Sequence, residues 1–135
     1  MQSRIIMIVA LFAFLITATS ARAVPRDAFN GQWKVTVTPQ DEARKAGEKE
    51  FKDTLIFKGA MFKSTECEKK GFKETQYEEN TQHGIVATFK AETKSDKEGA
   101  ATWTGDVNGN VIKGELEWKK PDGTVVKYSY TGEKQ

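Results

Sequence analysis

The residue whose position is most unusual for its chemistry is Asp53. It shares alternate positions with Phe51, Leu55 and Phe57, so an extended strand would point its carboxylate to the same side as these apolar side chains. A buried carboxylate without partners is strongly destabilising, and it therefore needs hydrogen bonds, a counter-charge or a wet opening. We expect Asp53 to bind a donor group of a ligand at the mouth of the fold. The alternative is a strand end or a bulge that turns the side chain outward.

Aromatic side chains form the second candidate for a binding site. They recur on the inward positions of the alternating segments, together with small residues such as Gly105 and Gly114. An apolar cavity walled by aromatic rings would suit a small, mostly apolar molecule, and Tyr128 and Tyr130 could give Asp53 a polar partner. The predicted ligand-binding residues are Asp53, Phe89, Trp103, Trp118 and Tyr128. The alternative is that large and small side chains interlock and leave no cavity.

Residues that carry enzymatic or metal chemistry are scarce. His83 is the only histidine and Cys67 the only cysteine, so the chain has neither a zinc-ligand pair nor an intrachain disulfide. No nucleophile stands at local spacing from His83. We therefore predict a protein that is not an enzyme, with no catalytic residues, no metal and no cofactor; catalytic groups that converge from separate strands are the alternative. Cys67 is expected to be a small buried residue, with intermolecular pairing as the alternative.

The elements that must position these residues are strands. Apolar and polar residues alternate with a period of two in segment after segment, which is typical of half-buried strands. Six strands are predicted at 33–37, 51–58, 84–92, 101–107, 112–118 and 126–130, and two with weaker alternation at 60–66 and 71–77. Turn residues separate them: Asn108-Gly109 predicts a type I′ turn, and Pro121-Asp122-Gly123 a type I turn followed by a left-handed glycine.

Eight short strands with one apolar face each must bury those faces together. We therefore predict an all-β fold, an eight-stranded antiparallel up-and-down β-barrel, because closure also removes exposed strand edges. A two-sheet sandwich is the alternative, and the polar outward positions argue against a membrane barrel. Residues 39–50 interrupt the strands with one or two predicted helical turns at 41–46, and we place them as a loop over one end, where a ligand would enter.

The sequence Asn30-Gly31-Gln32-Trp33 opens the first predicted strand. A Gly-x-Trp at this place in a small eight-stranded barrel resembles the calycins, the group that contains lipocalins and avidins. The resemblance implies that Trp33 plugs the closed end of the barrel and that the 39–50 loop caps the open end. Gly31-Gln32-Trp33 is also similar to the start of secreted bacterial metalloprotease inhibitors, although the disulfide of that family has no counterpart here.

The first 23 residues have the order of a secretory signal peptide. Arg4 precedes an unbroken apolar run at 5–16, and Ala21-Arg22-Ala23 offers small residues at a cleavage site. The run is short for a membrane span, which needs about 20 residues, so an uncleaved anchor is only the alternative. We expect residues 1–23 to be removed, residues 24–135 to form a single barrel domain without membrane insertion, and the protein to be secreted or periplasmic.

The charge pattern argues against a nucleic-acid partner. The chain has 21 Lys and Arg and 19 Asp and Glu, and residues 1–23 hold two basic residues and no acidic one, so the rest is balanced. Its charges alternate in sign, as on a solvated surface. We predict an exported, non-enzymatic binding protein whose barrel holds a small apolar ligand. The alternative is a protein-interaction module such as a protease inhibitor, acting through residues 24–29 or the hairpin tips.

Overall fold

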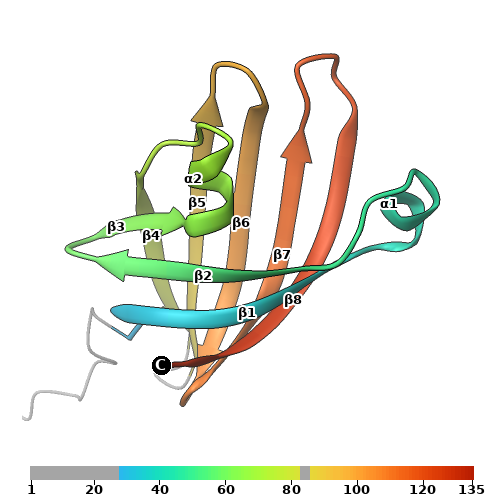
Figure 1. The fold of residues 1–135 in the computed structure, drawn as a ribbon. Helices are drawn as coiled ribbons and strands as arrows, with labels where there is room; N and C mark the ends of the chain where they lie inside the picture. The colour runs from blue at the N-terminus through green and yellow to red at the C-terminus, as the bar shows by residue number, and fades with distance from the viewer. Residues whose placement is uncertain (1–27, 83–85) are drawn as a thin grey trace, which may run out of the picture.

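The computed structural model describes residues 28–82 and 86–135, and in these residues eight strands close into an antiparallel barrel. Each strand pairs with the next in the chain and β8 pairs with β1, so the predicted up-and-down barrel is confirmed (Figure 1). The strands are β1 (Gly31–Pro39), β2 (Phe51–Lys58), β3 (Met61–Ser64), β4 (Thr75–Gln82), β5 (Val86–Ser95), β6 (Gly99–Asn108), β7 (Val111–Lys119) and β8 (Val125–Lys134), and the helices are α1 (Asp41–Lys45) and α2 (Thr65–Lys69). The predicted signal peptide and His83 lie outside the described residues.

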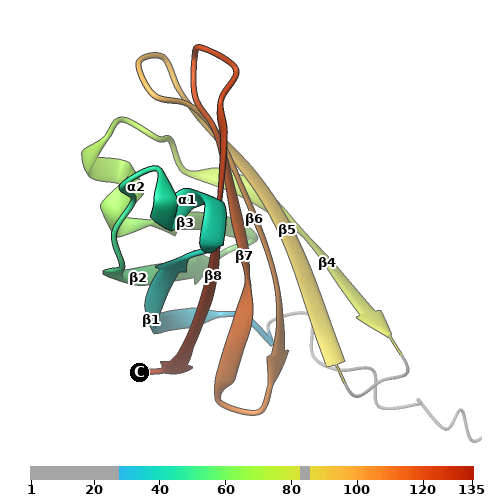
Figure 2. The same cartoon turned by 90° about the vertical axis from the view of Figure 1, so that its right-hand side faces the viewer.

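The barrel is strongly bent. Strands β1 and β2 run nearly across the direction of β5, β6 and β7, and both short helices lie on one side, above β1 and β2 (Figures 1 and 2). Helix α1 belongs to the loop that joins β1 to β2, where helical turns were predicted. Within the described ranges, no helix has the length and apolar character needed to cross a bilayer.

The weakest predicted strands differ most from the structure. The strand predicted at 60–66 ends at Ser64, where α2 begins, and the strand predicted at 71–77 lies instead at Thr75–Gln82. The reason is a helix cap: the Ser64 hydroxyl accepts a hydrogen bond from the Cys67 amide (3.1 Å), which favours a helical turn over further extension. Strand β3 consequently pairs with β4 through only two residue pairs.

Two hairpin turns show how glycine sets the chain reversal. The Asn108–Val111 pair encloses Gly109 and Asn110, and of these two only Gly109 has a positive φ (60°), so the turn is not the predicted type I′ centred on Asn108-Gly109. Gly59 and Ala60, between β2 and β3, both have positive φ (57° and 64°), as a type I′ turn requires.

The interior of the barrel is filled with aromatic rings. Phe57 packs against Phe62 and Phe89 with ring centroids 5.1 and 4.9 Å apart, and Phe29 joins them from the segment that precedes β1. At the same end Trp33 is fully buried, and its indole N–H donates to the Phe29 carbonyl (2.8 Å). Large and small side chains therefore interlock in the middle and at this end of the barrel.

Candidate functional site

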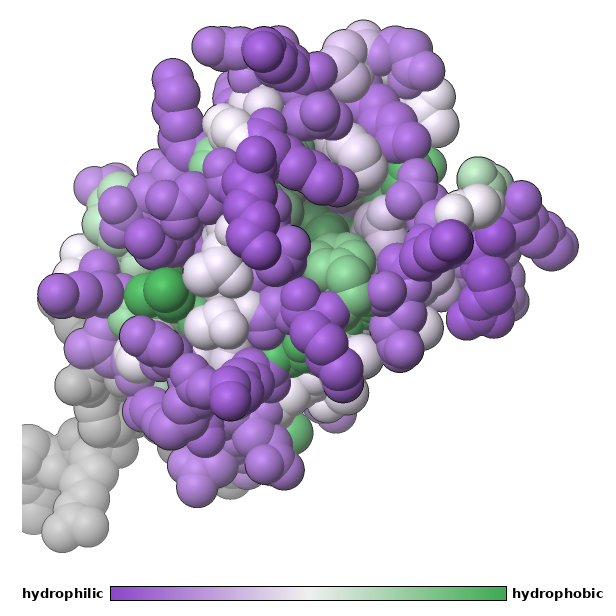
Figure 3. All heavy atoms as spheres, in the orientation of Figure 1, coloured by the Kyte–Doolittle hydropathy of each residue, from purple (hydrophilic) through white to green (hydrophobic). Residues whose placement is uncertain are grey.

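An apolar pocket lies at the end of the barrel opposite Trp33, beside α2. It is lined by Phe51, Cys67, Lys70, Phe72, Ala101, Leu116, Trp118 and Tyr128. We call this set of residues the mouth pocket. Figure 3 shows a hollow with an apolar floor surrounded by hydrophilic side chains on the face that carries α2 and β2. The volume of the mouth pocket is about 30 Å³, room for about one water molecule or one small apolar group.

Strand alternation places the aromatic wall of the mouth pocket. Leu116 and Trp118 are consecutive inward positions of β7, and Tyr128 on β8 lies directly opposite Leu116 in the register. Phe51, the first residue of β2, packs edge-on against Tyr128 with the ring centroids 5.8 Å apart. The wall is therefore built from three strands whose ends meet at one rim.

Two lysine side chains lie over the ring of Trp118. The Lys70 and Lys120 ammonium nitrogens lie 5.0 and 4.8 Å from the centroid of the ring, within the distance of a cation–π interaction. The indole N–H donates to the Glu98 carbonyl (2.6 Å) and so fixes the plane of the ring. Trp118 is half-buried, so one part of its ring is apolar wall and another part faces the solvent beside two positive charges.

Glu48 closes the polar side of the same rim. It lies in the loop after α1, and its two carboxylate oxygens accept hydrogen bonds from Lys120 Nζ (3.1 Å) and the Tyr128 hydroxyl (2.7 Å). The Tyr128 hydrogen bond, with help from Lys120 and Lys70, lowers the pKa of Glu48, which is therefore ionised at neutral pH. Conversely, burial and the neighbouring Glu48 raise the pKa of Tyr128.

The inner wall of the mouth pocket comes from α2 and the turn that follows it. Cys67 is buried, and burial raises the pKa of its thiol to about 11, so the thiol is neutral and contributes an apolar surface. Phe72 is buried beside it, where the chain turns from α2 toward β4. Sequence reasoning predicted Cys67 as a small buried residue, and the structure confirms its burial.

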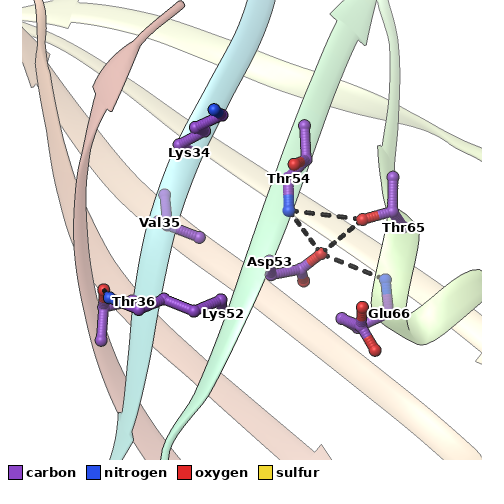
Figure 4. A pocket seen from close by; sticks show the side chains of 8 residues that line it. All are labelled: Lys34, Val35, Thr36, Lys52, Asp53, Thr54, Thr65 and Glu66. Carbon is purple, nitrogen blue, oxygen red and sulfur yellow. Dashed lines mark hydrogen bonds between the residues drawn. The ribbon is translucent and has the colours of Figure 1, made fainter.

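Asp53 points inward, as its parity predicted, and its side chain is 5% exposed. Its carboxylate accepts hydrogen bonds from the Thr54 amide (2.7 Å), the Thr65 hydroxyl (2.9 Å) and the Glu66 amide (3.1 Å), as Figure 4 shows. Its second oxygen accepts from the Ser64 hydroxyl. The donors from Ser64, Thr65 and Glu66 hold the start of α2 on β2, so Asp53 positions the helix that lines the mouth pocket. Direct binding of a ligand by Asp53 stays a prediction.

The five predicted site residues therefore occupy three places. Trp118 and Tyr128 meet in the mouth pocket, whereas Phe89 and Trp103 lie in the packed interior and Asp53 beneath α2. The expected contact of Asp53 with the tyrosines does not form, because Tyr128 donates to Glu48 and Tyr130 to the Thr104 carbonyl (2.8 Å). Among the described residues, no oxygen or nitrogen accepts a hydrogen bond from the buried Trp103 indole N–H. The indole acts on the Cys67 thiol, where its small lowering effect on the pKa is outweighed by burial.

Comparison with known proteins gives no relative. No family model, curated protein or solved structure matches the chain. The site is thus interpreted from its own geometry. Within residues 28–82 and 86–135, no group of three or more His, Cys, Asp or Glu side chains is arranged to hold a metal ion.

Three polar residues of the rim were missed from the sequence: Glu48, Lys70 and Lys120. Each stands among other charged residues, and the chain has many Lys–Glu alternations of the same appearance. Glu48 is 72 residues from Lys120 and 80 from Tyr128, so no local pattern signals the contact. The only available signal was the prediction that the 39–50 loop covers one end of the barrel.

Proposed function

We propose that this chain is an exported, non-enzymatic binding protein that takes up a small, mostly apolar molecule at the mouth pocket. The observation that carries the proposal is the meeting of Phe51, Leu116, Trp118 and Tyr128 in one apolar hollow at the loop-covered end. Concave apolar sites with a few polar groups at the rim are the usual form of small-molecule sites in proteins. The ligand enters beside the 39–50 loop.

The size of the mouth pocket limits how the ligand binds. A volume of about 30 Å³ accepts only one end of a molecule, such as a methyl group or a ring edge. The rest of the ligand lies on the half-exposed rings of Phe51 and Trp118. This shallow mode differs from the aromatic-walled cavity that the sequence predicts, because the interior below the mouth pocket is filled by Phe62, Phe89 and Trp103.

A fluorescence titration with N-phenyl-1-naphthylamine, a neutral apolar dye, tests the proposal. We expect the dye to bind the wild-type protein and to bind the Trp118→Leu variant about tenfold more weakly, because an aromatic contact of about 1.5 kcal/mol is lost. Val111→Ala is the matched control, since Val111 is an exposed apolar residue at the opposite end of the barrel. The absence of dye binding to the wild-type protein, or equal binding by all three proteins, would overturn the proposal.

Kinship with the calycins is part of this proposal. Its support is the closed barrel in chain order, the burial of Trp33 at the end away from the mouth pocket, and the α1 loop at the mouth. These features agree with the roles that the resemblance implies for Trp33 and the 39–50 loop. Export is proposed from the sequence of residues 1–23 alone.

A protein-interaction module, such as a protease inhibitor, is the second candidate. The observation in its favour is the small volume of the mouth pocket, which accepts the tip of one side chain of a partner as well as it accepts one end of a small molecule. An inhibition assay against secreted metalloproteases, comparing the wild-type protein with Trp118→Leu and with a variant that lacks residues 24–27, tests this candidate. The deletion stops before Phe29 because that residue belongs to the core.

A further inference from the structure

The Glu48 carboxylate lies at a place where the acidic group of a ligand would find the same two hydrogen-bond donors, Lys120 and Tyr128. It occupies the rim of the mouth pocket, and both of its oxygens accept hydrogen bonds, one from Lys120 and one from Tyr128. Tyr128 also lines the apolar part of the pocket, and Lys120 lies over the Trp118 ring. An apolar wall and a pair of carboxylate-binding donors are therefore contiguous.

Two lysines lie close to the Glu48 carboxylate at the rim of the mouth pocket. Lys70 and Lys120 both flank Trp118, and both act on the single carboxylate of Glu48. The other carboxylate that acts on Lys120 belongs to Asp122, which is exposed and accepts a hydrogen bond from the Thr124 amide (2.8 Å) in the β7–β8 turn. Among the described residues, Glu48 is the carboxylate that accepts hydrogen bonds from both Lys120 and Tyr128.

We propose that Glu48 acts as an internal stand-in for the ligand, and that the ligand is an apolar molecule with a carboxylate or similar oxyanion that displaces Glu48 from Lys120 and Tyr128. This inference rests on the proposed function, whose site it shares, and adds the chemical class of the head group. The apolar end of the ligand enters the mouth pocket while its anionic head takes the two hydrogen bonds. Charge-assisted hydrogen bonds of this kind are about twice as strong as neutral ones.

Displacement of Glu48 is feasible because its side chain lies at the solvent boundary. The Lys120 and Glu48 side chains are 31% and 23% exposed, so a carboxylate that leaves the rim returns to water without crossing the core. Its backbone stays anchored by the hydrogen bond from the Glu48 amide to the Ala43 carbonyl (3.0 Å). Side-chain rotation alone therefore frees the rim, and the barrel does not have to open.

Because Glu48 occupies Lys120 and Tyr128, it lowers the apparent affinity of the protein for an anionic ligand that binds the same two residues. The anionic ligand binds only the fraction of molecules in which Glu48 has left the rim, and its apparent dissociation constant rises as that fraction falls. Glu48→Gln keeps the size of the side chain but removes its charge. We therefore expect this variant to bind an anionic ligand about tenfold more tightly than the wild-type protein, with little change for a neutral ligand.

The test uses two dyes with the same ring system, neutral N-phenyl-1-naphthylamine and anionic 8-anilinonaphthalene-1-sulfonate. Binding of each is titrated by fluorescence with the wild-type protein, Glu48→Gln and Lys120→Met, and circular dichroism checks that each variant is folded. In each variant the affinity for the anionic dye is compared with that for the neutral dye. We expect the ratio of these two affinities to rise about tenfold in Glu48→Gln and to fall about tenfold in Lys120→Met. Octanoate should displace the anionic dye at lower concentration than octanol does.

The outcomes separate this inference from the proposed function. If the neutral dye binds through Trp118 but Glu48→Gln leaves the affinity for the anionic dye unchanged, the internal stand-in is refuted and the apolar site remains. If Glu48→Gln tightens both dyes equally, Glu48 acts as a steric lid and the anionic head group is refuted. If neither dye binds the wild-type protein, the proposed function falls as well.

Discussion

The hydroxyl of Tyr130 occupies the space that Gly105 leaves open by having no side chain. A Cβ at Gly105 would collide with the Tyr130 oxygen, which instead donates to the Thr104 carbonyl (2.8 Å). Gly114 faces Gly105 across β6 and β7, and a Cβ there would stand 2.7 Å from the same oxygen. The space beside Gly105 and Gly114 is thus filled by the Tyr130 side chain and is not open to a ligand.

Gly105→Ala should destabilise the barrel. The added methyl group would meet the Tyr130 hydroxyl and also lie 2.8 Å from the Lys113 carbonyl oxygen, so the core is overpacked. We expect the free energy of unfolding to fall by about 1–3 kcal/mol in urea denaturation. Adding Tyr130→Phe should recover part of the loss, because it removes one of the colliding atoms. Strictly additive losses in the double variant would contradict the proposed collision.

Ala60→Gly should stabilise the protein. Ala60 has a φ of 64° in the turn between β2 and β3, a left-handed conformation that is unfavourable for a residue with a Cβ by about 1–2 kcal/mol. The gain is partly offset by the greater flexibility of glycine in the unfolded chain, so we expect a net increase of about 0.5–1 kcal/mol. Thermal unfolding of the two proteins measures it. A lower melting temperature for the variant would show that the turn has another conformation.

Asp53→Asn should loosen α2 from the barrel. The amide presents one acceptor where the carboxylate presents two, so at least one of the donors from Ser64, Thr65 and Glu66 loses its partner. Leaving such a buried donor unsatisfied costs about 1–3 kcal/mol, and amide hydrogen exchange in α2 should accelerate. Asp96→Asn, at an exposed position in the β5–β6 turn, serves as the control. Unchanged exchange in α2 would refute the anchoring role of Asp53.

Asp53 and Glu48 should give the protein opposite dependences on pH. Burial raises the pKa of Asp53 above its usual 3.8. Protonation of Asp53 therefore favours the folded protein. This contribution to stability is fully present below pH 3.8 and is lost as the pH rises through the higher folded pKa. The Tyr128 hydroxyl lowers the pKa of Glu48 below its usual 4.5, so its contribution is present above that value and is lost as the pH falls through the lower folded pKa.

Urea denaturation between about pH 2.5 and 7 measures the two contributions. Relative to Asp53→Asn, the wild-type protein should lose stability as the pH rises from 3.8. Relative to Glu48→Gln, it should lose stability as the pH falls below 4.5. Two differences of the same sign would show that one of the carboxylates has a different environment from the one described.

The Cys67 thiol should resist modification in the folded protein. Its pKa of about 11, against the usual 9.0, reduces the thiolate fraction near pH 8 by about a hundredfold, and burial blocks access in addition. We expect the reaction with 5,5′-dithiobis(2-nitrobenzoate) to be at least about a hundred times slower than in guanidinium chloride, where the chain is unfolded. Rapid labelling without denaturant would mean that α2 opens easily.

The strands and their inward faces could be predicted because alternation is a local property of the sequence. Trp33, Asp53, Trp103 and Tyr128 all point inward, as their parity predicted. The weak segments failed at Ser64, where a capping hydroxyl and the distant carboxylate of Asp53 turn the chain into α2. Alternation alone cannot show such a competition between a strand and a helix cap.

Six of the eight strands, their inward faces and the order of strands along the chain follow from the sequence, because a period of two and turn residues act between near neighbours. Closure of the barrel, by contrast, is what brings Tyr130 into the gap at Gly105 and Glu48 to Lys120 and Tyr128. These relationships join atoms that are 25 to 80 residues apart, and they depend on how the bent sheet closes. Packing and charge pairing act through space, so the filled interior and the mouth pocket exist only once the barrel has formed.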